Sequence, residues 1–171
     1  SNHRPYDSWQ KDVLLQNVRL GVICPNVHTD IFKSFLQRLN TTIQANDNSD
    51  YIQPYTGFHS IYKTLLEIPD NGTDKWINIE ATPKDTLSLA RSICLQANSL
   101  ADKYPGIVIV IFIPASWSIH RQFKHNGESF DLHNYIKAYA AQHRFTTQII
   151  EEKTLRDPMV CEICWLSLIH I

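Results

Sequence analysis

Residues 107–112 of this 171-residue chain read IVIVIF, a run dominated by β-branched residues. Pro105 and Gly106 precede the run and Pro114 follows it, so residues that interrupt regular structure bound it on both sides. A continuous apolar segment of this length is typical of a strand covered on both faces, as in the middle of a parallel sheet. The stretch therefore indicates a domain in which helices cover both faces of a sheet.

The segments on either side continue an alternation of strands and helices. We expect further strands at 18–24, 76–80 and 146–151, and loops at 44–55 and 114–129. We expect helices at 29–40, 57–67, 82–103, 131–143 and 158–171, with Thr82 as the cap of the third and Pro83 at its first position. This order predicts an α/β, Rossmann-like domain with a mostly parallel central sheet flanked by helices. Residues 1–17 are expected to be a linker segment, and 18–171 the domain itself.

The charge balance limits the kinds of ligand that the chain can attract. Sixteen basic and 17 acidic residues give a net charge of −1, so a generally basic surface for nucleic acid is excluded. An anion would have to bind in a local pocket. We found no signal peptide and no apolar run of membrane-spanning length, and we expect a cytoplasmic protein without a membrane partner.

The four cysteines are too few for a disulfide framework in a chain of this length. Cys24 and Cys94 lie in apolar runs and are expected to be buried as small hydrophobic residues. Cys161 and Cys164 form a C-x-x-C pair, but no second ligand pair accompanies them, so core packing is favoured over a metal site.

Ligands of open parallel sheets bind at the carboxyl ends of the strands, so the segments after residue 112 are the first place to search for a site. His133 and Lys137 are four residues apart on an expected helix and therefore share one face near its N-terminus. Gln148, in the next strand, would add a neutral donor. These residue types suit a terminal phosphate, although such a pair is also common on a solvated helix face.

The block at 130–155, FDLHNYIKAYAAQHRFTTQIIEEKTL, resembles the MID domain of prokaryotic Argonautes. His133, Lys137 and Gln148 fall at positions of that family's guide-binding motif, in its histidine-lysine subtype. The preceding stretch at 109–117 (IVIFIPASW) resembles the family's strand and the loop that faces the first guide base, and looser similarities extend over nearly the whole chain. The family's last phosphate-binding lysine would fall beyond Ile171, so the domain is expected to be cut before a PIWI domain.

The resemblance implies a role for individual residues. His133, Lys137 and Gln148 would bind the 5′-phosphate of a single-stranded RNA or DNA guide. The first base would meet Ser116, Trp117 and Arg121, although Trp117 can equally be a core residue. Lys153 is a further candidate cation. A Mg²⁺ ion bridging the guide phosphates is compatible with the family, but no carboxylate cluster in the sequence requires it.

The expected function is therefore the anchoring of a guide strand in defence against invading nucleic acid, with a PIWI domain as partner. The chain has neither a glycine-rich phosphate loop nor a nucleophile elbow, so it is expected to bind and not to catalyse. An alternative is a small flavodoxin-like mononucleotide-binding enzyme or domain, which would use the same end of the sheet. A third hypothesis is an interaction scaffold with a vestigial pocket.

Overall fold

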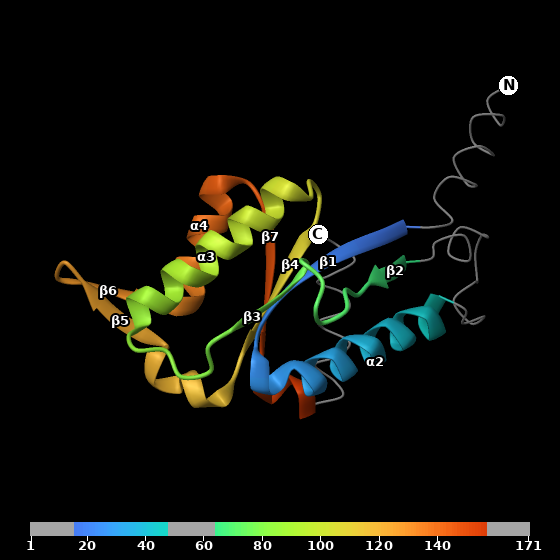
Figure 1. Ribbon diagram of the computed structural model, residues 1–171, viewed down its shortest axis with the longest axis horizontal. Helices are drawn as coiled ribbons and strands as arrows, with labels where there is room; N and C mark the ends of the chain where they lie inside the picture. Colours follow the sequence, from blue (N-terminus) through green and yellow to red (C-terminus); the bar gives the residue numbers. More distant parts are fainter. Residues whose placement is uncertain (1–15, 48–63, 157–171) are drawn as a thin grey trace, which may run out of the picture.

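The computed structural model describes residues 16–47 and 64–156 (Figure 1). Five parallel strands form the central sheet: β1 (Gln16–Pro25), β2 (Thr64–Glu67), β3 (Trp76–Ile79), β4 (Val108–Ile113) and β7 (Thr146–Glu151). The order is β2-β1-β4-β7, and β3 pairs with the second half of β1 while β2 pairs with its first half. This arrangement confirms the predicted Rossmann-like α/β fold.

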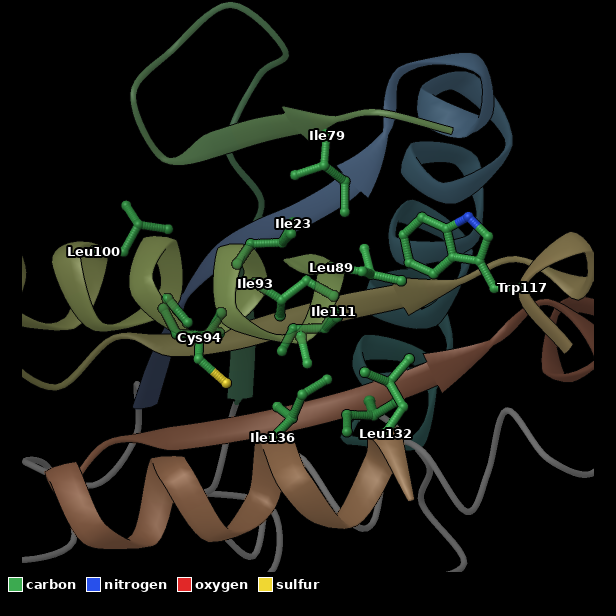
Figure 2. Packing of buried hydrophobic residues seen from close by; sticks show 14 of the residues in the cluster. Ile23, Ile79, Leu89, Ile93, Cys94, Leu100, Ile111, Trp117, Leu132 and Ile136 are labelled. Atoms are coloured by element: carbon green, nitrogen blue, oxygen red, sulfur yellow. The ribbon is translucent and has the colours of Figure 1, made fainter. Parts of the chain in front are cut away.

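Helices cover both faces of the sheet, and each face has its own hydrophobic core. On one face, α2 (Thr29–Asp47) contributes Phe32, Phe35, Leu36 and Leu39, which pack against Val110, Phe112 and Ile150 of the sheet. On the other face, α3 (Thr86–Lys103) and α4 (Leu132–His143) pack against Ile109, Ile111 and Ile149 (Figure 2). Because β4 presents residues to both cores, 107–112 must be apolar throughout, as the sequence indicated.

The predicted strands at 76–80, 107–112 and 146–151 are confirmed within one residue, and β1 is longer than expected at both ends. The expected helix at 57–67 is wrong over its last four residues, which form β2. There the side chain of Asn40 supports the strand, since its amide donates to the Leu66 carbonyl (3.3 Å) and its oxygen accepts from the Leu66 amide (3.0 Å). The rest of that expected helix, residues 1–15 and the expected helix at 158–171 with Cys161 and Cys164 lie outside the described residues.

Two helix boundaries also differ from the sequence prediction. The cap of α3 is Asp85 and not Thr82, because the Asp85 carboxylate accepts from both the amide (2.8 Å) and the hydroxyl (2.8 Å) of Ser88. Helix α2 continues to Asp47, into the first part of the expected loop at 44–55. Cys24 and Cys94 are buried as predicted, and burial raises the pKa of each thiol to about 12.

The expected loop at 114–129 contains regular structure. A 3₁₀ helix, η4 (Ala115–His120), is followed by a hairpin of β5 (Gln122–His125) and β6 (Glu128–Asp131). The two residues at the hairpin tip, Asn126 and Gly127, have φ values of 53° and 81°. An Asn-Gly pair between alternating strands is the sequence signal for this turn, and the prediction of a loop overlooked it.

Candidate functional site at the carboxyl ends of β4 and β7

A pocket of about 510 Å³ lies where the parallel strands β4 and β7 end. Three segments line it: the chain from Ile113 to Arg121, the first turn of α4 from Asp131 to Asn134, and the end of β7 with the residues up to Lys153. The pocket therefore occupies the predicted end of the sheet. It also brings together the loop after β4 and the helix that the sequence pattern singled out.

Trp117 forms an inner wall of this pocket and belongs to the core. Its side chain is only 2% exposed, and the indole Nε1 donates to the Ala81 carbonyl at 2.8 Å. Figure 2 shows the ring pointing inward on the side of Leu89. Of its neighbours, Ser118 lines the pocket, whereas Ser116 is exposed and does not. In this arrangement Trp117 has no free ring face to stack on a base.

The far side of the pocket carries opposite charges close together. Arg121 Nη2 lies 2.8 Å from Glu151 Oε1, and Lys153 Nζ lies 3.7 Å from Glu151 Oε2. Both cations are exposed, so these ion pairs contribute little to stability. The neighbouring Glu152 accepts a hydrogen bond from the Ala115 amide at 2.9 Å and thereby holds the start of η4 against the end of β7.

In the first turn of α4, two of the backbone amides that could bind an anion already donate hydrogen bonds within the protein. Asp131 is the N-cap, and its carboxylate accepts from the Asn134 amide at 3.1 Å. The Leu132 amide donates to the Arg121 carbonyl at 2.8 Å. A bound anion would therefore depend mainly on side chains here, and His133 is exposed at the pocket from this turn.

Lys137 lies one turn further along α4 and is half-buried. Its ammonium donates to the Thr147 carbonyl of β7, and within residues 16–47 and 64–156 no carboxylate forms an ion pair with it. Burial lowers the pKa of Lys137 below its ordinary value. The buried hydroxyl of Thr147 also has no hydrogen-bond partner in the described part of the chain. Lys137 is thus a cation with unused donor capacity, although it is not one of the residues that line the pocket.

The structure does not bring Gln148 together with His133 and Lys137. Gln148 pairs in register with Val110, which packs in the core under α2, whereas Thr147 pairs with Ile109, which packs under α3 and α4. Alternate residues of a strand point to opposite faces. Lys137 therefore approaches β7 from the α4 face, while the Gln148 side chain leaves it on the α2 face.

The sequence reasoning missed several residues of this site, among them Asp131, Glu151 and Glu152. A signal was available for Glu151, since it follows Thr147 and Ile149 at a spacing of two and so shares their face of β7. His120 is buried beside this site, with its Nδ1 at 2.6 Å from the Thr86 hydroxyl.

The described residues contain no group of three or more His, Cys, Asp or Glu side chains placed to hold a metal ion. A Mg²⁺ ion at this pocket would therefore take most of its ligands from a bound phosphate group and water. No helix in the described part of the chain is long and apolar enough to cross a membrane.

Comparison with known proteins found similarity among solved structures. No protein-family profile matches the chain, and no curated protein matches it. Among solved structures it is similar to the Argonaute of Aquifex aeolicus, with 11% sequence identity and a TM-score of 0.46. The superposition covers 95% of this chain and 20% of that one, so this chain spans about a fifth of that protein's length. A likeness of this size describes the course of the backbone and assigns no function to it.

Proposed function

We propose that this domain binds the 5′-phosphorylated end of a single-stranded RNA or DNA guide in a prokaryotic Argonaute. The first nucleotide would occupy the pocket at the ends of β4 and β7. The observation that carries this proposal is Lys137, a half-buried cation one helical turn after the pocket residue His133, with no carboxylate partner in the described part of the chain. The sequence resemblance at 130–155 supplies the family context.

A half-buried ammonium without a counter-ion is costly, because it has lost part of its hydration and gained no opposite charge in return. A phosphate monoester would supply that charge and accept the hydrogen bonds that the Thr147 carbonyl leaves unused. His133 lies one helical turn before Lys137, about 6 Å along the helix axis, and lines the pocket. These two residues can therefore bind one phosphate at the pocket edge.

The remainder of the pocket suits the nucleoside that follows such a phosphate. Its volume of about 510 Å³ lies within the range of small-molecule sites, and its walls combine apolar residues with a few polar groups. The polar side chains available to a base or sugar include Ser118, Arg121 and Glu151, and Lys153 adds a second cation at the rim. Trp117 would support this wall from behind.

The proposal assigns the phosphate to His133 and Lys137 and gives Gln148 no direct contact from the α4 side. The domain would act by binding alone. Any nuclease or effector chemistry in the proposed defence role would belong to a PIWI domain or another partner. A Mg²⁺ ion, if it takes part, would bridge guide phosphates.

A mononucleotide-binding enzyme or domain is the second candidate, and the volume of the pocket favours it because the space suits a single nucleotide. The two functions differ in the length of the ligand. A guide anchor should bind a 5′-phosphorylated oligonucleotide more tightly than the matching nucleoside monophosphate. An enzyme should bind both equally and convert the small molecule.

The direct test compares a short 5′-phosphorylated oligonucleotide with its 5′-hydroxyl twin by fluorescence anisotropy. We expect the phosphorylated end to bind at least about ten-fold more tightly, since a charge-assisted hydrogen bond contributes about 1.5–3 kcal/mol. Lys137→Met should remove most of this difference while it keeps the apolar stem packed. Lys124→Met, on the exposed hairpin, makes the same charge change and should preserve it. Equal affinity for the two ends in the unmodified chain would refute the proposal.

A further inference from the structure

Three carboxylates line the pocket, and they differ in what they bind. Asp131 accepts from the Asn134 amide and Glu152 accepts from the Ala115 amide, so both have structural partners in the backbone. Glu151 contacts only the two exposed cations, Arg121 and Lys153, within the described residues. Glu151 is therefore the carboxylate of this pocket that can exchange its surface ion pair with Lys153 for a ligand.

The backbone holds Glu151 in place although its side chain is partly exposed. It is the last residue of β7 and pairs in register with Ile113 at the end of β4. It lies on the same face of the strand as Ile149, which is buried and also lines the pocket. The strand fixes the backbone of Glu151, and the ion pairs with Arg121 and Lys153 orient its carboxylate, so less conformational freedom is lost when a ligand binds there.

We infer that Glu151, together with Arg121, reads the first base of the guide and favours guanine. This inference rests on the proposed function and deepens it by naming the nucleotide that the pocket prefers.

The chemistry of the four bases supports guanine. A carboxylate only accepts hydrogen bonds, through two neighbouring oxygens. The pairing edge of guanine presents two adjacent N–H donors, at N1 and N2, which match those oxygens. Adenine and cytosine present one amino donor beside an acceptor, and uracil or thymine presents one N–H between two carbonyl groups. With these bases an acceptor would face a Glu151 oxygen.

Arg121 can bind the O6 atom of guanine, which lies next to the N1–H group that would face Glu151. Its Nη2 lies 2.8 Å from Glu151 Oε1, so the donors of the guanidinium are adjacent to the acceptors of the carboxylate. In guanine the O6 acceptor is next to the N1–H donor, and an arginine commonly binds O6. The ion pair thus presents donors followed by acceptors, in the order that the guanine edge requires.

The test uses 5′-phosphorylated oligonucleotides that differ only in the first base: guanine, adenine, cytosine, uracil and hypoxanthine. Hypoxanthine is guanine without the 2-amino group, so it removes one donor and nothing else. We expect guanine to bind about ten-fold more tightly than hypoxanthine or the other bases, which corresponds to one hydrogen bond to a charged group. Glu151→Gln should bring the guanine-to-hypoxanthine ratio close to one. Glu128→Gln, on the exposed hairpin strand β6, should leave the ratio unchanged.

The outcomes separate this inference from the proposed function. If the 5′-phosphate strengthens binding but guanine and hypoxanthine bind equally, the inference is wrong and the guide-binding function stands. If guanine is preferred and Glu151→Gln keeps that preference, another residue reads the base and the inference is again wrong. If the 5′-phosphate has no effect on any of the oligonucleotides, the proposed function fails and the inference fails with it.

Discussion

Replacement of Trp117 should primarily destabilise the fold. The side chain is 2% exposed and its Nε1 donates to the Ala81 carbonyl, so Trp117→Ala removes a large buried ring and leaves a part-buried carbonyl without its donor. Truncation of a buried tryptophan costs about 3–5 kcal/mol, and loss of the hydrogen bond adds about 1 kcal/mol. We therefore expect a loss of about 4–6 kcal/mol. For a chain of this length that loss should lower Tm by about 8–24 °C.

Urea and thermal denaturation followed by circular dichroism would measure this loss. Trp117→Phe should cost about 1–2 kcal/mol, since it keeps most of the buried area but not the hydrogen bond. Ile119→Ala is a matched control in the same 3₁₀ helix, because Ile119 is 78% exposed and its truncation should change stability by less than about 0.5 kcal/mol. A Trp117→Ala protein that melts within about 2 °C of the parent would refute the placement of this ring in the core. The main effect of Trp117→Ala would then have to be on the preference for the first base.

Three further predictions concern stability. Asp85→Ala should cost about 1 kcal/mol in urea denaturation, because the amide of Ser88 at the start of α3 loses its cap. Gly21→Ala should cost about 1–3 kcal/mol in the same assay, since an added Cβ would lie 3.1 Å from buried side chains. Burial lowers the pKa of Lys137, so the unfolded chain binds more protons than the folded one between the two pKa values. The free energy of unfolding should therefore rise as the pH increases toward the ordinary lysine pKa of about 10.4, and Lys137→Met should flatten this rise.

The sequence predicts the fold well where one physical rule dominates. Residues 107–112 are buried, and a short apolar run rich in β-branched residues between two breakers favours a strand covered on both faces. The strand at 64–67 could not be found in this way. It is short, and its position depends on hydrogen bonds from Asn40, a residue on the preceding helix. Such long-range contacts are not visible in local periodicity.

The candidate site was predictable in location and only partly in composition. The rule for parallel sheets located the pocket, and helical spacing placed His133 and Lys137 on one face of α4. Gln148 was added by resemblance without attention to strand parity, and the register with Val110 turns its side chain to the other face. The alternation of side chains along β7 would also have identified Glu151 as a residue on the α4 face, where the pocket lies. Burial of Trp117 follows from tertiary packing and could not be derived from the loop sequence.

The hairpin and helix α4 meet without an intervening residue, since Asp131 ends β6 and is also the N-cap of α4. The Arg121 carbonyl, just before β5, accepts from the Leu132 amide and closes this junction from the other side. Because no residue separates the two elements, a displacement of the hairpin is passed directly to the first turn of the helix. Binding of another molecule to the hairpin tip would therefore shift His133 and the pocket wall formed by this turn. The rigidity of the junction determines how precisely these pocket residues are positioned.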